Sequence, residues 1–130
     1  MARVAIIGAG LAGLVVARQL NRHAEITVFE KSRGVGGRMA TRYDSDFEFD
    51  HGAQFFTART PQFRRFLGPL IDARVVANWP ASFVELRGST VAAARRWDDA
   101  YPHFVGVPRM NEVGKYLARD LDVRLQTRVS

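Results

Sequence analysis

The sequence contains no cysteine among its 130 residues. This absence excludes disulfide bonds, thiolate metal centres and a cysteine nucleophile. Histidine is scarce as well, because the chain has three and none lies at a spacing typical of a zinc site. The length suits one domain with its own core, and the 47% hydrophobic and 25% charged residues are the composition of an ordinary globular protein.

Long hydrophobic runs are also missing. The apolar stretch after Arg3 is interrupted by three glycines and ends at Arg18, so it is too short to span a bilayer. It does not have the organisation of a signal peptide either, because the glycines break the apolar region. From the sequence we therefore expect a cytoplasmic protein that has no membrane partner.

Lysine is rare, since all but two of the 19 basic residues are arginine, and the formal net charge is +6. A positive balance favours anionic partners, among them nucleotides and nucleic acids. We expect no nucleic-acid partner, because the arginines are spread along the chain without a basic helix or an aromatic platform. Strongly salt-dependent DNA affinity that survives substitution of Gly10 or Glu30 would favour that alternative.

The first thirty residues have the pattern of a βαβ unit. Residues 3–7 are a short β-branched run that ends at Gly8, which predicts a buried strand. Small apolar residues at helical spacing predict a helix over 10–22, and residues 25–30 predict a second strand. The two strands are therefore expected to be parallel, with a right-handed crossover between them.

The turn between this strand and helix carries a Gly-x-Gly-x-x-Gly motif at residues 8–13, and Glu30 ends the second strand. In such a turn Gly8 permits the sharp bend, Gly10 lets a pyrophosphate approach the backbone, and Gly13 allows helix and strand to pack closely. The diphosphate would bind the free N–H groups at the positive end of the helix. The carboxylate of Glu30 would accept hydrogen bonds from the adenosine ribose.

The acidic residue also indicates which nucleotide is favoured. A carboxylate at Glu30 repels a 2′-phosphate, which argues against NADP, while the neighbouring cations of Lys31 and Arg33 weaken this argument. The motif by itself does not separate NAD from FAD. A glycine-rich turn that packs a helix on a sheet without any ligand is the alternative interpretation.

The loop at residues 31–42 contains Gly36-Gly37-Arg38, where the arginine offers a fork of donors to phosphate oxygens. A kink is expected at Gly68-Pro69, inside an apolar helical pattern. The remaining segments are predicted as two short extended pieces within 47–57, a helix over 61–72, short β segments within 73–91, an unpatterned stretch over 92–107, a helix after Pro108 and a strand over 123–129.

Three segments, KSRGVGGRMATR, FDHGAQFFTAR and FVGVPRMNEVGKYL, resemble in this order the renalase-like branch of the flavin-containing amine oxidoreductases. The resemblance implies FAD as the cofactor. It further implies hydride transfer to the flavin from a reduced nitrogenous small molecule, such as an isomeric NAD(P)H or an amine, and then to O2. We assign no catalytic residue and no metal ligand, because hydride transfer to a flavin does not require a side-chain base.

The resemblance also implies residue roles. It places Ala53, Gln54 and Phe55 along the flavin ring and the backbone of Val129 against the adenine. The predicted cofactor-binding residues are Gly8, Gly10, Leu11, Ala12, Gly13, Glu30, Lys31, Gly37, Arg38, Ala53, Gln54, Phe55 and Val129. Five aromatic side chains are candidates for a substrate pocket or for the core, and core packing is the expectation for most of them: Phe47, Phe49, Phe55, Phe56 and Trp79.

The predicted fold class is α/β, with a Rossmann-like βαβ FAD-binding unit and the start of a truncated α+β substrate domain. Residues 1–60 hold the FAD-binding unit and the Gly-Gly-Arg loop, 61–107 a partial substrate-domain segment, and 108–130 a helix and strand that return to the FAD-binding domain. Because the family is longer, we expect an N-terminal portion that self-associates or pairs with a missing C-terminal part. A dinucleotide-binding module without catalysis is the alternative function.

Overall fold

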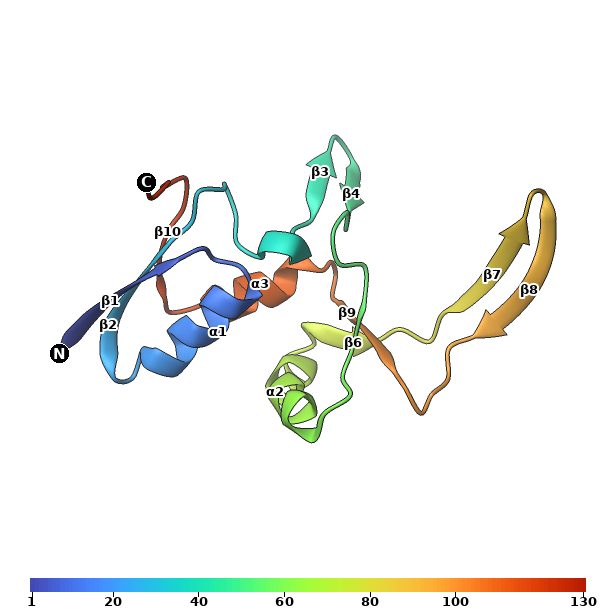
Figure 1. Ribbon diagram of the computed structural model, residues 1–130, viewed down its shortest axis with the longest axis horizontal. Helices are drawn as coiled ribbons and strands as arrows, with labels where there is room; N and C mark the ends of the chain where they lie inside the picture. The colour runs from blue at the N-terminus through green and yellow to red at the C-terminus, as the bar shows by residue number, and fades with distance from the viewer.

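The computed structural model describes residues 1–130 as a mixed α/β fold (Figure 1). None of its helices combines the length and the apolar character that crossing a lipid bilayer requires. In chain order the elements are β1 (Ala2–Ile7), α1 (Leu11–Leu20), β2 (Ala24–Phe29), the 3-10 turn η1 (Gly37–Met39), β3 (Arg42–Asp44), β4 (Phe47–Phe49), β5 (Phe56–Thr57), α2 (Pro61–Asp72), β6 (Val76–Asn78), β7 (Ser82–Arg87), β8 (Thr90–Arg96), β9 (His103–Gly106), α3 (Asn111–Ala118) and β10 (Asp122–Arg124).

The parallel sheet has the strand order β1-β2-β10, with β2 in the centre. Ile6 of β1 and Val123 of β10 both pair with Val28 of β2, and both pairings are parallel. Helix α1 packs against β1 and β2, and α3 packs against α1 (Figure 1). The structure therefore confirms the predicted parallel βαβ unit, and it places a third strand from the end of the chain beside it.

The core is one continuous cluster of buried apolar side chains. Residues Ile26 and Val28 point from β2 toward the helices because side chains alternate along a strand. The cluster also receives Leu70 of α2 and Val76 of β6, so segments far apart in the sequence share it. The cluster comprises Ala9, Leu14, Ala17, Ala24, Ile26, Val28, Met39, Leu70, Val75, Val76, Met110, Val113 and Leu117.

Helix α2 begins where the sequence predicts it. The side chain of Thr60 caps its start by accepting a hydrogen bond from the Phe63 N–H at 3.2 Å, and Pro61 occupies the first turn. The helix continues without interruption through Gly68-Pro69, where the sequence predicts a kink. Its apolar face packs toward the core, which supports the helix despite the N–H that Pro69 lacks.

The second half of the chain forms antiparallel pairings that the sequence pattern shows only in part. Strands β5, β9 and β6 make a sheet in that order, and β3-β4 and β7-β8 are separate hairpins. The stretch 92–107, which has little pattern, contains the end of β8 and all of β9. Strand β9 has only four residues, too few for a periodicity to be recognised. The β7-β8 hairpin projects from one end of the molecule (Figure 1).

The predicted strand over 123–129 is wrong beyond Arg124. Strand β10 ends there, and Gln126 adopts a left-handed conformation with φ of 52°. The Gln126 N–H donates to the Ser32 carbonyl at 3.0 Å, and the Thr127 N–H donates to the Glu30 carbonyl at 2.8 Å. The apolar alternation therefore does not continue as a strand, because the chain turns to bond the segment that follows β2.

Candidate functional site

The turn between β1 and α1 leaves the start of the helix open. Gly8 has φ of 97°, and its N–H donates to the Phe29 carbonyl at 2.8 Å, which joins the turn to the end of β2. Gly10 is the residue before the helix; no side chain caps it, and no acidic residue lies in the first turn. The Leu14 N–H closes the first helical turn on the Gly10 carbonyl at 3.0 Å. The N–H groups of Ala12 and Gly13 and the positive end of the helix dipole are therefore available to an anion.

Two glycines of this turn are required for different physical reasons. A Cβ atom added at Gly13 would lie 2.1 Å from the Gly8 carbonyl oxygen, so contact between helix and turn demands glycine there. A Cβ atom added at Gly10 would meet no protein atom within 4 Å. Packing within the chain explains Gly13 and does not explain Gly10. The free space at Gly10 is what close approach of a phosphate needs.

Glu30 follows β2 and is almost completely buried, with 7% of its surface exposed. One carboxylate oxygen accepts the Ala9 N–H at 2.8 Å, and the other accepts the Ser32 N–H at 2.8 Å. Burial raises the pKa of this carboxyl group, but the two backbone hydrogen bonds outweigh it, and the pKa lies below its ordinary value. The ionised carboxylate is thus held at the turn and keeps lone pairs for further donors.

This lowered pKa predicts how stability depends on pH. The carboxylate contributes stability above the unfolded-state value of about 4.5, and the contribution is lost as pH falls through the lower folded-state pKa. Urea unfolding of the unaltered chain and of Glu30→Gln should therefore differ by a constant free energy above about pH 5.5. The difference should shrink in more acidic solution. A difference that grows with acid would contradict the assigned charge state.

The Gly-Gly-Arg loop lies beside the start of α1. The Gly36 N–H donates to the Ala9 carbonyl at 2.9 Å, and the Ala53 N–H donates to the Arg38 carbonyl at 2.9 Å. A Cβ atom added at Gly52 would lie 2.1 Å from that same Arg38 oxygen, so the two backbones touch. The guanidinium group of Arg38 is exposed and has no ionic or hydrogen-bonding partner in the chain. The backbone of Arg38 is therefore fixed while its charge is free to bind a ligand.

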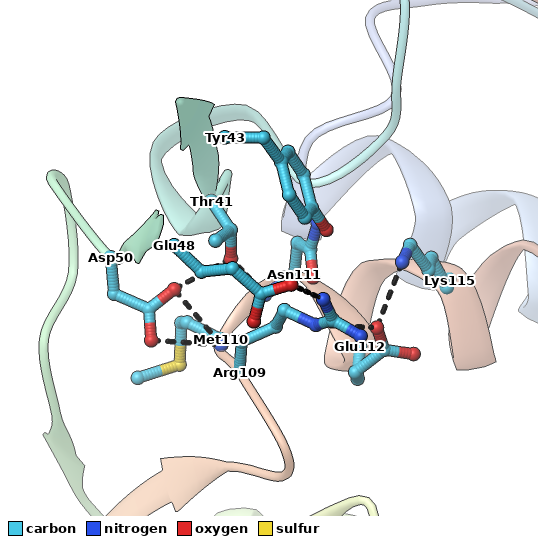
Figure 2. A network of polar contacts seen from close by, with 9 residues as sticks. All are labelled: Thr41, Tyr43, Glu48, Asp50, Arg109, Met110, Asn111, Glu112 and Lys115. Atoms are coloured by element: carbon cyan, nitrogen blue, oxygen red, sulfur yellow. Dashed lines mark hydrogen bonds and ion pairs between the residues drawn. The ribbon is translucent and has the colours of Figure 1, made fainter. Parts of the chain in front are cut away.

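A buried polar network holds this loop to α3 (Figure 2). The Thr41 hydroxyl donates to Asp50 at 2.6 Å, and the Met110 N–H donates to the same carboxylate at 3.1 Å. The Asn111 N–H donates to the Thr41 hydroxyl oxygen at 3.4 Å. Helix α3 has no capping side chain of its own, so Asp50 and Thr41 supply the cap from a distant part of the chain.

An outer group of charged residues joins the β3-β4 hairpin to α3 (Figure 2). The Arg109 guanidinium pairs with Glu48, and its Nε lies 3.4 Å from a Glu112 carboxylate oxygen. Lys115 donates to Glu112 at 2.8 Å, and this hydrogen bond raises the pKa of Lys115. Arg109 also lies 5.5 Å from the centre of the Tyr43 ring. The charged side chains of this group pair with one another, which indicates a structural role for the group.

Asp50→Asn tests the structural role of the network. The amide keeps the shape of the carboxylate but loses the charge-assisted bonds to Thr41 and Met110, so we expect a loss of about 1–2 kcal/mol in unfolding free energy. Asp46→Asn, in an exposed turn, is the matched control and should change stability by less than about 0.5 kcal/mol. Equal urea midpoints for the two variants would contradict the capping role.

Two cavities adjoin the turn and share Ile7 and Gly8 in their walls. The larger has a volume of about 940 Å³ and the smaller about 380 Å³. Of the predicted binding residues, the larger cavity is lined by Gly8, Gly10, Leu11, Ala12, Gly13, Gly37, Arg38 and Ala53. The smaller cavity is lined by Gly8, Glu30, Lys31 and Val129. The structure thus brings the glycine turn, the arginine loop and the acidic residue to two neighbouring cavities.

Comparison with known proteins agrees with this geometry. Residues 6–70 match the family described as NAD(P)-binding Rossmann-like domain. The chain belongs to this family. It is also 43% identical over 51 residues to 4,4'-diapophytoene desaturases (4,4'-diaponeurosporene-forming) of Staphylococcus aureus strains Newman, USA300 and NCTC 8325. This similarity covers 38% of the chain and 10% of each desaturase, so the chain spans a small part of these relatives.

Two of the residues predicted to bind the cofactor lie outside the two cavities. Gln54 and Phe55 line neither cavity. The ring of Phe55 lies 5.0 Å from that of Trp97 and 4.9 Å from that of His103, in an aromatic cluster beside β9. Trp79 belongs to the same cluster, at 5.0 Å from Trp97. The contact of Gln54 and Phe55 with a flavin ring stays a prediction.

Other lining residues were not predicted as binding residues. Phe63, Phe66 and Leu67 come from α2, and their spacing in the sequence indicates only a face that packs on something apolar. Thr127 and Arg128 line the smaller cavity together with Glu30 because the chain end turns back after β10. No local signal distinguishes a helix face that lines a cavity from one that fills a core, and none marks the return of the chain end.

Proposed function

We propose that this Rossmann-like domain binds the ADP portion of FAD and is part of an FAD-dependent oxidoreductase. The observation that carries the proposal is the uncapped start of α1 beside Gly10, where a Cβ atom would meet no protein atom within 4 Å. Phosphate oxygens fit this position, because no side chain caps the first turn of α1 and the free guanidinium of Arg38 borders the same cavity.

The donor and acceptor groups suit a dinucleotide along its length. The first turn of α1 and Arg38 would hold the diphosphate, and Glu30 in the smaller cavity would accept the ribose hydroxyl groups. Lys31 and the backbone of Val129 would border the adenosine. When bound, FAD supplies the acceptance of a hydride by its flavin ring. The chain's own residues bind and orient the cofactor.

The proposed substrate is a small molecule that gives up a hydride. The resemblance to the renalase-like branch favours a reduced nitrogenous compound, either an isomeric NAD(P)H or an amine, with O2 as the final acceptor. The similarity to a desaturase supports the redox class, because desaturation removes hydrogen from a substrate.

As partners we propose a second copy or a complementary polypeptide, since the β7-β8 hairpin exposes Val84 and Leu86 by 57% and 61%.

The test is titration calorimetry of the chain with FAD and with ADP. Both nucleotides should bind, and Arg38→Ala should weaken binding about tenfold, because a charge-assisted contact with the diphosphate is lost. Arg22→Ala is the control, since Arg22 lies beyond the far end of α1 and should leave binding unchanged. Absence of heat with both nucleotides would overturn the proposal.

A dinucleotide-binding module without catalysis is the second candidate. The observation that favours it is the extent of the similarities, because the family match ends at residue 70 and the desaturase similarity covers 51 residues. Under this candidate the chain binds FAD and transfers no electrons. Mixing the FAD-bound chain anaerobically with a hydride donor separates the two functions, since an oxidoreductase bleaches the flavin absorbance and a binding module does not.

A further inference from the structure

Strand β1 is an edge of the parallel sheet, because β2 is the one strand beside it. The Gly8 N–H donates to the Phe29 carbonyl of β2, so every second residue of β1, counted back from Gly8, directs its backbone groups toward β2. The backbone N–H and C=O groups of the intervening residues point away from the sheet, and no backbone group outside the sheet bonds them. These residues are Arg3, Ala5 and Ile7.

This edge lacks the features by which proteins keep an exposed strand from pairing. Strand β1 contains no proline, and its register with β2 runs without a bulge. Its single charge, on Arg3, is matched by Glu25 of β2 at 3.6 Å. The side chains of Ala5 and Ile7 are exposed, and 62% of the Ile7 surface is open. An edge of this kind is expected to accept a further strand.

Apolar side chains of α1 flank the same edge. Gly13 faces β1, since a Cβ atom there would lie 3.4 Å from an Ile6 methyl group. Val16 and Leu20 follow Gly13 at helical spacing, so they lie on the β1 side of the helix. The other side of α1 meets α3, where Arg18 donates to carbonyl groups at the end of that helix. Val16 and Leu20 are 44% and 37% exposed, so apolar surface continues from the strand edge onto the helix.

A second copy of this edge is complementary to it. Antiparallel pairing of two β1 strands about a twofold axis at Ala5 places Ala5 opposite itself and Arg3 opposite Ile7 of the other copy. The outward-pointing N–H and C=O groups of all three residues then exchange hydrogen bonds. The two arginines lie roughly 14 Å apart along the strands, and each keeps its own Glu25, so no like charges meet.

The helices match across the same axis. Because α1 packs over β1 and β2, one added strand spacing puts the two copies of α1 roughly 10 Å apart, which is near the distance of packed helices. The axis runs the helices antiparallel, so their dipoles oppose favourably, and Val16 and Leu20 of each copy face the other. A foreign strand would satisfy the backbone groups but would not supply this apolar match.

We infer that the chain forms a symmetric dimer by antiparallel pairing of two β1 edges, with α1 of each copy flanking the contact. Pairing joins the two three-stranded sheets into one continuous sheet. The inference rests on the partner named in the proposed function: it selects a second copy and assigns it to β1 and not to the β7-β8 hairpin. Nucleotide binding is a separate part of the proposed function, and the dimer does not require it.

Sedimentation measured over about 1–200 μM tests the dimer. The unaltered chain should pass from a species of 14.6 kDa to one of twice that mass as concentration rises. Ala5→Pro should keep the monomer fold, because proline is tolerated where the N–H of an edge strand faces solvent, and should weaken dimerisation at least about tenfold. Val84→Lys, on the exposed hairpin, is the control and should leave dimerisation unchanged.

A pair of charged variants tests the register of the pairing. Ala5→Lys and Ala5→Glu each place like charges opposite one another at the twofold axis, so neither should dimerise alone. An equimolar mixture should dimerise, because lysine then faces glutamate. Both variants should fold, since the side chain of Ala5 is exposed. In the unaltered chain, the amides of Arg3, Ala5 and Ile7 should become protected from hydrogen exchange only at concentrations where the dimer forms.

The outcomes separate the inference from the rest of the proposed function. A mass that doubles with concentration, is lost in Ala5→Pro and returns in the mixed charge variants supports the inference. A chain that stays monomeric, a dimer that the Ala5 variants leave intact, or a mixture that fails to associate overturns it, as does a dimer that Val84→Lys abolishes. Failure of the unaltered chain to bind ADP in a parallel titration overturns the nucleotide-binding proposal instead, whatever its mass.

Discussion

A chain that carries Gly13→Ala is expected to lose about 3 kcal/mol of unfolding free energy, or to fail to fold. The added methyl group would lie 2.1 Å from the Gly8 carbonyl oxygen and 3.4 Å from an Ile6 methyl group. Backbone lies on both sides of this contact, so relief requires α1 to move away from β1. That movement of α1 would open the apolar core between the helix and the sheet.

Gly10→Ala, three residues earlier, is expected to leave the stability of the fold nearly unchanged and to weaken nucleotide binding. Its methyl group meets no protein atom within 4 Å, and Gly10 has φ of −75°, which any residue adopts. The fold should therefore keep its stability to within about 0.5 kcal/mol. The methyl group occupies the space that a diphosphate needs, so affinity for ADP and FAD should fall about a hundredfold.

Urea unfolding and calorimetry with ADP, applied to both variants, measure the contrast. Gly34→Ala is the control for glycine replacement, because it lies in the loop with nothing within 4 Å and should change neither quantity. Unchanged ADP affinity in Gly10→Ala would contradict a diphosphate at this turn. A stable Gly13→Ala chain would show that helix and turn can separate without opening the core.

Glu30→Ala is expected to lower the unfolding free energy by about 2–3 kcal/mol and to abolish measurable ADP binding. The Ala9 N–H is fully buried and would lose its acceptor, while the exposed Ser32 N–H would turn to water. The buried donor therefore carries most of the loss in stability. The loss of binding has a separate cause, because the ribose hydroxyl groups lose their acceptor in the smaller cavity.

The matched control for this substitution is Glu25→Ala, in β2, the strand that Glu30 follows. Glu25 pairs with Arg3 at 3.6 Å, and both side chains are mostly exposed, so its removal should change stability by less than about 0.5 kcal/mol. Glu30→Ala should therefore unfold at a lower urea concentration and bind ADP more weakly than Glu25→Ala. Similar behaviour of Glu25→Ala and Glu30→Ala would contradict the role assigned to the buried carboxylate.

The nucleotide half of the site could be predicted because its signals are local. The apolar run before Gly8, the glycine motif and the position of Glu30 each depend on residues within one turn or one strand. Steric limits at Gly13 and the open helix start follow directly from that spacing. Eleven of the thirteen predicted residues line one of the two cavities, although Ala53 and Val129 were implied by the family resemblance and not by a local signal.

The other half of the site depends on contacts between distant segments. The stripe at Phe63 and Phe66 predicts an apolar helix face, but only the position of α2 beside η1 and β5 makes part of it a cavity wall. The alternation over 123–129 predicts a strand, but hydrogen bonds to Ser32 and Glu30 turn the chain after Arg124. In both places tertiary contacts outweigh a weak local preference.

The order of residues alone therefore establishes the βαβ unit, its glycine turn and the acid after β2, because backbone sterics and side-chain periodicity act over a few residues. Three-dimensional packing decides the rest. It places Asp50 at the start of α3, brings Arg128 into the cavity that Glu30 lines, and adds Phe63 and Phe66 to the lining of the cavity that holds Arg38. These pairs lie far apart in the chain, and their contact depends on how the apolar faces of all the elements are buried together.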